Sequence, residues 1–184
     1  MEYLQHIDGQ ILLWIQDNVR NDFLTPIFKF ITHLGDTGWF WIAMTIFCLF
    51  FAKTRKVGFL SAIALIGSLV INNLILKNLI ARIRPYEVVD GLTRLIEAQH
   101  DYSFPSGHAG ASFAAAVIFF IYLPKKFGVP ALILALLISL SRLYVGVHYP
   151  SDVLAGGLIS TAIAVCIWRI AEHIQKKPHI KGDL

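Results

Sequence analysis

The sequence predicts an all-α integral-membrane protein, in which a bundle of about five transmembrane helices follows N-terminal interfacial helices. Hydrophobic residues make up 56% of the 184 residues, charged residues make up only 15%, and the mean hydropathy is +0.63. The length is that of a single domain, which we assign to residues 1–184. The apolar residues are gathered into five blocks without Asp, Glu, Lys or Arg: 38–52, 57–76, 109–123, 129–140 and 153–168.

The N-terminal segment, residues 1–37, is expected to form one or two amphipathic helices at the outer membrane interface. Between residues 11 and 18, apolar side chains fall on one helical face and polar side chains on another. Pro26 and Gly35 then interrupt the chain. Packing of these helices against the transmembrane bundle is the alternative to an interfacial position.

The blocks differ in how well they fit a membrane span. Block 57–76 alone has the roughly 20 apolar residues that a span requires, and the others approach that length when their flanking residues are included. Block 38–52 has the weakest claim, because a helix of that length rises only about 22 Å.

Basic residues follow the first, third and fifth blocks, which puts them on one side of a five-span protein. The positive-inside rule makes this side cytoplasmic. The pI of about 9.1 therefore reflects topology and contact with the lipid bilayer, and no nucleic-acid partner is expected. We expect a multi-pass protein of a bacterial-type plasma membrane. The three clusters are Lys53, Arg55 and Lys56; Lys125 and Lys126; and Arg169, Lys176, Lys177 and Lys181.

Three cations lie near the outward ends of the predicted spans. Lys77 precedes Arg84 by seven residues, which on a helix returns to nearly the same face, whereas Arg82 falls on a different face. Arg142 lies late in the fourth span. A charged residue at mid-bilayer costs about 2.5–3.5 kcal/mol. We therefore expect these cations to line a polar cavity or to bind an anion, with snorkelling to the interface as the alternative.

The sequence Pro105-Ser106-Gly107-His108 opens an apolar helix. Ser106 suits the N-cap position, and Gly107 would let an anion approach the free backbone N–H groups. A well-capped helix without a ligand is the alternative for Ser106. His108 lies in the first turn, where the positive end of the helix dipole disfavours a protonated imidazole. A bound anion would reverse this effect, so the segment indicates an anion site.

A second histidine precedes the fifth span. Pro150 suits the first turn of that helix, which places His148 just before it and Asp152 inside it. A carboxylate so close can reach an imidazole nitrogen, fix its tautomer and raise the basicity of the other nitrogen. His148 is therefore a candidate nucleophile or base, although an isolated histidine here would be an ordinary interfacial residue.

Together these groups fit phosphoryl transfer, which needs positioning and stabilisation of charge on the phosphoryl oxygens. Oriented by Asp152, His148 can attack phosphorus and form a phosphohistidine, while His108 protonates the leaving oxygen and then activates water. No cofactor and no metal site are predicted, since fixed cations supply the positive charge. The predicted phosphate-binding residues are Lys77, Arg84, Ser106, Gly107 and Arg142.

Three motifs within residues 77–152 resemble the signature of the type 2 phosphatidic acid phosphatase family, whose wider superfamily includes the vanadium haloperoxidases. The first, a Lys, six residues and then Arg-Pro, occurs as KNLIARIRP from Lys77 to Pro85. The second occurs as PSGH. The third, Ser-Arg, five residues, His, three residues and Asp, occurs as SRLYVGVHYPSD from Ser141 to Asp152. All signature positions match in type, order and spacing.

The resemblance implies a membrane-helix bundle with an active site near the outer, extracytoplasmic surface. It also implies a membrane lipid phosphate as the substrate: phosphatidate, phosphatidylglycerol phosphate, undecaprenyl diphosphate or a lipid A phosphate. The compact, bacterial-type chain favours undecaprenyl diphosphate. The loop of residues 86–102 would tune specificity, although solvent exposure explains its charges equally well. The oligomeric state is left open.

Two other functions stay as alternatives. A non-enzymatic transporter or channel would explain buried cations along an ion path, but not the His–Asp spacing or the PSGH motif. A phosphate-lipid sensor without catalysis is opposed by the intact histidines.

Overall fold

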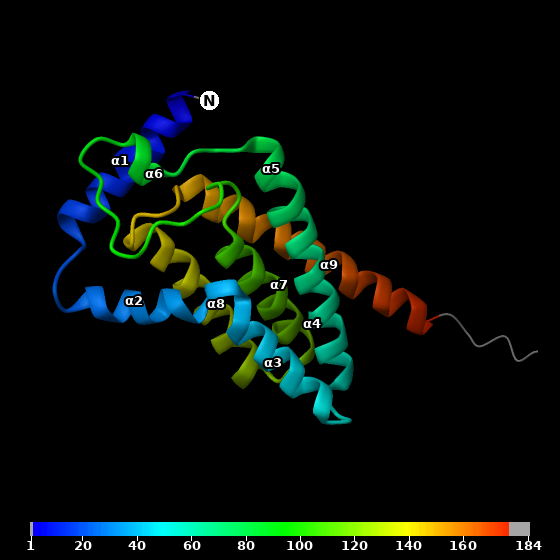
Figure 1. The fold of residues 1–184 in the computed structure, drawn as a ribbon. Helices are drawn as coiled ribbons and strands as arrows, with labels where there is room; N and C mark the ends of the chain where they lie inside the picture. The colour runs from blue at the N-terminus through cyan, green and yellow to red at the C-terminus, as the bar shows by residue number, and fades with distance from the viewer. Residues whose placement is uncertain (1, 177–184) are drawn as a thin grey trace, which may run out of the picture.

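The computed structural model describes residues 2–176, which form a helical bundle with one longer loop (Figure 1). Within these residues there is no β-strand, so the all-α prediction is confirmed. Lys177 and Lys181 of the third basic cluster lie outside the described residues. The elements are α1 (Glu2–Asn18), α2 (Leu24–Leu34), η1 (Asp36–Gly38), α3 (Trp39–Phe50), α4 (Arg55–Ser68), the π-helical η2 (Leu69–Leu76), α5 (Lys77–Ile80), α6 (Pro85–Val88), α7 (Gly107–Tyr122), α8 (Lys125–Tyr144) and α9 (Pro150–Lys176).

Each of the five charge-free blocks falls largely within helix. Three segments, Arg55–Val88, Lys125–Tyr144 and Pro150–Lys176, are long and apolar enough to cross a membrane. The segments Asp36–Phe50 and Gly107–Tyr122 are apolar but shorter. The prediction of a multi-pass helical membrane protein is confirmed, and the first block is one of the two short cases, as its length indicated.

Helix α7 packs against α4, α8 and α9 in the middle of the bundle (Figure 1). Its buried positions include the small residues Ala109, Ala114 and Ala115, and small side chains let neighbouring helices approach closely. A Cβ atom on Gly156 of α9 would lie only 2.5 Å from the carbonyl oxygen of Ser106. This close approach holds the N-terminal ends of α7 and α9, which carry two of the three motifs, side by side.

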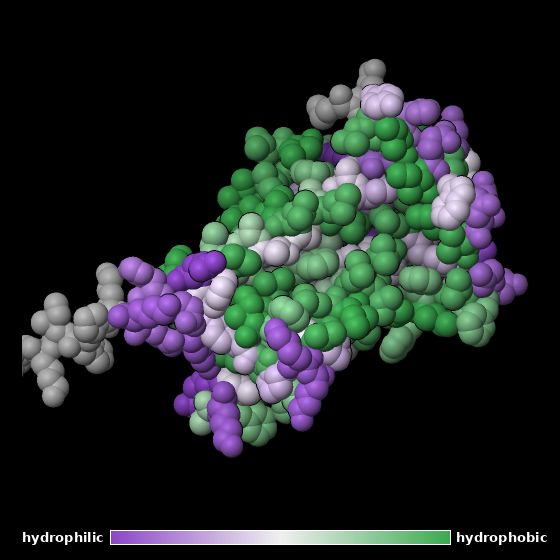
Figure 2. Space-filling view, turned by 180° about the vertical axis from the view of Figure 1, so that it is seen from behind, coloured by the Kyte–Doolittle hydropathy of each residue, from purple (hydrophilic) through white to green (hydrophobic). Residues whose placement is uncertain are grey.

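A broad apolar surface covers the middle of the molecule on the face seen in Figure 2, and hydrophilic residues gather toward two opposite ends. Exposed large apolar side chains occur on α3, α4, α8 and α9; examples are Phe47, Phe59, Leu136 and Leu158. Lipid tails suit such a surface, because they leave no apolar area in contact with water.

The N-terminal helices pack against the bundle on one face. Helix α1 contacts α8 and α9, and α2 contacts α8. Leu12 is fully buried in a cluster with Tyr149, and Arg20 Nε donates to the carbonyl of Tyr144 at 2.8 Å. Trp14 on the other face of α1 is exposed. Core packing, the alternative considered above, therefore describes the inner face, while an interfacial position of the outer face stays a prediction.

Candidate active site

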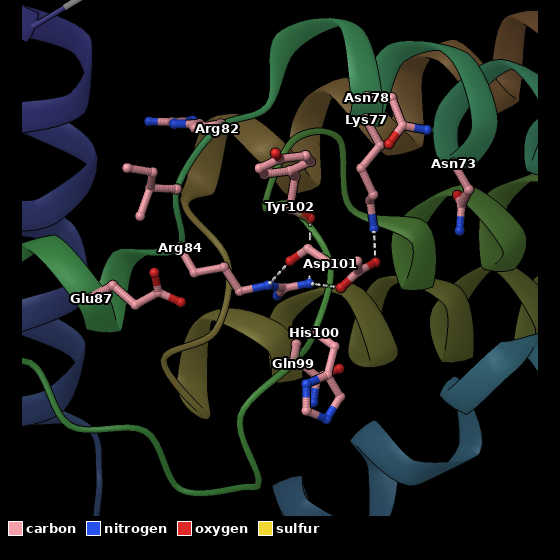
Figure 3. A pocket seen from close by; sticks show the side chains of 11 residues that line it. Asn73, Lys77, Asn78, Arg82, Arg84, Glu87, Gln99, His100, Asp101 and Tyr102 are labelled. Carbon is pink, nitrogen blue, oxygen red and sulfur yellow. Dashed lines mark hydrogen bonds and ion pairs between the residues drawn. The ribbon is translucent and has the colours of Figure 1, made fainter.

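The first motif lies where the second predicted span ends. Helix α5 ends at Ile80, Ala81 has a left-handed φ of 48°, and Arg84 is extended. The prediction that Lys77 and Arg84 share one helical face is therefore wrong, because the helix ends between them. The two side chains still converge, since both bind the carboxylate of Asp101 (Figure 3).

The predicted phosphate-binding cations are buried. Lys77, Arg84 and Arg142 are 5%, 3% and 0% exposed, which argues against snorkelling into water. Arg84 Nη1 donates to the carbonyl of Val147 at 2.8 Å, and Arg142 Nη1 donates to Thr32 Oγ1 at 2.7 Å. Arg142 Nε has no hydrogen-bond partner within residues 2–176. An anion in this cavity would satisfy that buried donor.

Asp101 occupies the point at which Lys77 and Arg84 meet. Arg84 Nη2 lies 2.5 Å from its carboxylate, and Arg84 Nε donates to its carbonyl at 2.9 Å. Burial raises the pKa of Asp101, but hydrogen bonds and charges from Lys77 and Arg84 outweigh burial and lower it to about 2. Asp101 is therefore an anion at neutral pH. In the sequence it is one of several loop charges, and no spacing singles it out.

The second motif begins α7. Ser106 Oγ accepts a hydrogen bond from the Ala109 N–H at 3.5 Å, so the N-cap prediction is confirmed. Gly107 is the first residue of the helix, and a Cβ atom there would lie 2.9 Å from Asn73 Nδ2. A side chain at this position would therefore displace the amide of Asn73. The phosphate-binding roles of Ser106 and Gly107 stay predictions.

His108 has a carboxylate partner that the sequence did not reveal. Its Nε2 lies 3.0 Å from Asp36 Oδ1, and Asp36 Oδ2 lies 2.7 Å from His33 Nδ1. A Cβ atom on Gly35 would lie 2.5 Å from His108 Cδ2, so this turn approaches the ring closely. An imidazole with a carboxylate partner suits proton transfer. The one sequence signal was an acidic residue between Gly35 and the first apolar block.

The third motif brings His148 and Asp152 together in the buried interior. The His148 Nδ1 to Asp152 Oδ2 distance is 3.5 Å, and the residues are 1% and 0% exposed. On the other side of the ring, Nε2 lies 3.3 Å from Arg84 Nη1. Burial, followed by the charges of Arg84 and Arg142, lowers the pKa of His148 well below its ordinary value. The ring is therefore neutral near pH 7, with Nε2 directed toward the cations.

Asp152 has further partners. Its Oδ2 accepts hydrogen bonds from the Tyr149 N–H at 2.9 Å and from Ser103 Oγ. Its Oδ1 lies 2.6 Å from Nη1 of Arg82. Arg82 was predicted to lie on a different helical face from Lys77 and Arg84. Arg82 is indeed separate from those two cations, but it lies against the carboxylate beside His148.

A cavity of about 590 Å³ connects these groups to an apolar groove between α3 and α4. A second pocket, of about 520 Å³, opens beside Lys77, Arg84 and Asp101 (Figure 3). The larger cavity therefore joins a cationic end to an apolar end. The cationic end is lined by Lys77, Arg84, His108, Arg142 and His148, and the apolar part by Ile42, Ile46, Leu49, Leu65, Ile66 and Leu69.

The sequence is similar to a known protein family and to several of its members. A family model described as the PAP2 superfamily matches residues 55–176. An undecaprenyl-diphosphatase from Sulfolobus acidocaldarius is 38% identical over 124 residues, which are 67% of this chain and 60% of that protein's length. The undecaprenyl-diphosphatase BcrC of Bacillus subtilis is 32% identical over 153 residues, 83% of this chain and 78% of the relative.

A solved structure has the same arrangement of helices. It is a transmembrane PAP2-type phosphatidylglycerolphosphate phosphatase from Bacillus subtilis, with a TM-score of 0.79 and 26% sequence identity. The match covers 97% of this chain and 90% of that one. The similarity therefore includes the N-terminal helices, which precede the residues matched by the family model.

Proposed function

The chain belongs to the PAP2 superfamily, and on that premise we propose that it is an integral-membrane lipid phosphatase that hydrolyses a phosphate monoester or diphosphate of a membrane lipid. One observation carries the proposal: Lys77, Arg84 and Arg142 converge with His108 and His148 on a single cavity. Cations that bind the phosphoryl oxygens and a neutral imidazole beside a carboxylate are the groups that stepwise phosphoryl transfer needs.

In the first chemical step, His148 Nε2 attacks phosphorus, and the bond from phosphorus to the leaving oxygen breaks as the N–P bond forms. Asp152 stabilises the positive charge that develops on the imidazole, because its carboxylate faces Nδ1. Asp36 engages His108 Nε2, so we assign His108 Nδ1 to protonation of the leaving oxygen. In the second step His108 takes a proton from water, the water oxygen attacks phosphorus, and inorganic phosphate leaves His148.

The carboxylate of Asp101 stands where a substrate phosphate group would bind. It contacts Lys77 and Arg84, and its side chain is 52% exposed, so it has room to move aside. A phosphate group carries more negative charge and more acceptor oxygens than a carboxylate. We therefore expect the substrate to displace Asp101 from these cations.

The shape of the larger cavity supports a lipid rather than a water-soluble ester. Its cationic end would hold the phosphate group, and its apolar part between α3 and α4 would hold the beginning of a hydrocarbon chain. Similarity to two undecaprenyl-diphosphatases favours undecaprenyl diphosphate. Phosphatidylglycerol phosphate, phosphatidate and lipid A phosphates are the other members of the substrate class.

The distribution of charge supports an active site on the extracytoplasmic side. Arg55 and Lys56 begin α4 and Lys125 begins α8, at the turns opposite the helix ends that carry the site. The test is a cysteine at Lys125 in a Cys48→Ala, Cys166→Ala background. It should resist a membrane-impermeant thiol reagent in intact cells, whereas a cysteine at Asp90 in the loop near the site should react. The reverse pattern would invert the orientation.

The enzymatic proposal is tested by phosphate release from a panel of lipid phosphates with purified protein in EDTA. Wild type should turn over at least one lipid, and His148→Ala and His108→Ala should abolish or strongly reduce turnover. His173→Ala is the matched control, because His173 is exposed in the last turn of α9, far along the helix from the site. Activity that survives His148→Ala would refute the nucleophile assignment. Absence of turnover with every lipid would favour a transporter or a sensor.

A further inference from the structure

A line of alternating charges reaches from helix α1 to the carboxylate beside His148. Asp8 Oδ2 lies 2.8 Å from Arg82 Nη2, and Arg82 Nη1 lies 2.6 Å from Asp152 Oδ1. Ser151 joins the same group, since its N–H donates to Asp8 Oδ1 at 3.2 Å and Arg82 Nη1 donates to its hydroxyl at 2.7 Å. Three segments far apart in the sequence therefore meet at one guanidinium group.

These charges are buried and closely packed. Asp8 is 3% exposed, Asp152 is 0% exposed, and the side chain of Arg82 is 15% exposed. The guanidinium carbon lies 3.8 Å from the centre of the Tyr149 ring, which is itself fully buried. In Figure 3, Arg82 turns away from Lys77 and Arg84 toward α1. Binding of the substrate phosphate by those cations gives no reason for this arrangement.

The net charge of Asp8, Arg82 and Asp152 together explains why Arg82 turns toward α1. Arg82 paired with Asp152 alone would neutralise the carboxylate that His148 needs, because oppositely charged groups at this distance in a buried site interact strongly. Asp8 on the far side of the guanidinium restores one net negative charge to the group. Asp152 can then stabilise a positive imidazole while Arg82 fixes the orientation of the carboxylate.

We propose that Asp8 and Arg82 are positioning residues; this inference rests on the proposed function. Together they fix the orientation of the Asp152 carboxylate and keep a net negative charge beside His148. Neither touches the reacting atoms. Asp8 lies outside residues 55–176 and comes from a helix that the sequence alone would assign to the membrane interface. The N-terminal helix thus contributes to the active site.

The proposal predicts opposite effects for the two members of the pair. With Asp8→Asn the full charge of Arg82 falls on Asp152, so the pKa of His148 should fall further. With Arg82→Gln the charge of the Asp152 carboxylate is no longer shared with a guanidinium group, so the pKa of His148 should rise. The charged and titratable groups facing His148 are Lys77, Arg84, His108, Arg142 and Asp152, and those facing Arg82 are Asp8, Tyr149 and Asp152.

The decisive measurement is an NMR titration of the protein with isotope-labelled histidine in detergent micelles, with the His148 signal assigned by its loss in His148→Asn. Relative to wild type, we expect His148 to titrate at higher pH in Arg82→Gln and at lower pH in Asp8→Asn. The matched control Asp17→Asn removes an exposed carboxylate from the same helix and should leave the titration unchanged. An unchanged or higher titration in Asp8→Asn, or no rise in Arg82→Gln, would overturn the proposal.

This titration needs no turnover, so it is read independently of the lipid assay. Failure of wild type to release phosphate would refute the proposed function and leave the titration to decide the role of Asp8 and Arg82. In an active enzyme, Asp8→Asn should lower kcat about tenfold with little change in KM, because the groups that bind phosphate are untouched. Loss of folded protein would also lower kcat, but the folded fraction would keep the wild-type His148 titration, and the unfolded fraction would give a separate signal that titrates near pH ~6.5.

Discussion

Replacement of Asp101 by asparagine tests whether this carboxylate occupies the phosphate site. The change keeps the size of the side chain and removes its negative charge. In wild type the contact with Lys77 and Arg84 must break before a phosphate group can bind to the same cations. Because the pKa of Asp101 is lowered to about 2, the contact is intact above about pH 4 and is lost only as the pH falls toward 2. The comparison therefore belongs near pH 7.

The size of the effect follows from burial. Lys77 and Arg84 are 6% and 3% exposed at their side chains, whereas Asp101 is 52% exposed. Exposed ion pairs contribute roughly 0.2–1 kcal/mol, so we take about 1 kcal/mol for this one. That energy corresponds to a ratio of about 5 between the occupied and the open site. The apparent affinity for phosphate is reduced by nearly the same factor, because only the open fraction binds.

We therefore expect Asp101→Asn to lower KM for the lipid phosphate, and the inhibition constant of inorganic phosphate, about fivefold at pH 7. kcat should change little, since the carboxylate has left the site before the chemical step. Initial rates over a range of lipid concentrations, with and without inorganic phosphate, measure all three constants. Asp90→Asn is the matched control, because Asp90 is an exposed carboxylate in the same loop.

Two results would refute the reasoning. Unchanged constants would mean that Asp101 does not compete with phosphate for Lys77 and Arg84. A higher KM with a lower kcat would mean that Asp101 is needed to hold those cations in their catalytic positions.

Three further predictions concern other groups of the site. Arg142→Lys should lower kcat/KM about 100-fold, because a lysine cannot keep both the 2.7 Å contact with Thr32 and a forked contact with phosphate; near-normal activity in the lipid assay would contradict this. Asp36→Asn should lower kcat about tenfold with KM unchanged, since it removes the carboxylate partner of His108; steady-state kinetics that show a change in KM alone would argue against that role. Because the pKa of His148 is lowered, its ring stays neutral as the pH falls below 6.5. The acidic limb of the pH profile of kcat/KM should therefore lie below pH 6.5, and a limb at or above that pH would contradict the lowered pKa.

Much of the fold could be predicted from the sequence because the bilayer imposes a simple rule on composition. Charge-free blocks mark the helices, and all five blocks lie largely in helix. The helix break at Ala81 could not be predicted, since a left-handed alanine has no sequence signature. The side chains of Lys77 and Arg84 do converge, as predicted. Their convergence depends on the turn after Ile80 and on their shared contact with Asp101, however, and not on helical spacing.

The candidate site could be predicted only where its residues lie in compact motifs. His148 and Asp152 are four residues apart at a helix start, so their proximity follows from local geometry. Asp8 lies 74 residues from Arg82, Asp36 lies 72 residues from His108, and Asp101 lies 24 residues from Lys77. Each lies near a turn or on a surface helix, where an acidic residue is ordinary, and only the tertiary fold shows which of them face the site.

These acidic partners explain how so many buried cations are tolerated in one place. Lys77, Arg84 and Arg142 repel one another, and a low-dielectric interior strengthens that repulsion. Asp101 reduces this repulsion, because its carboxylate binds both Lys77 and Arg84, and under the proposed function it does so at the position where the phosphate group of the substrate would bind. The contact of Asp101 with Lys77 and Arg84 thus stabilises the site without substrate and lowers its affinity for a phosphate group. On the proposed function, a lipid phosphate would replace one anion with another of greater charge, so the cations would not need to rearrange before phosphoryl transfer begins.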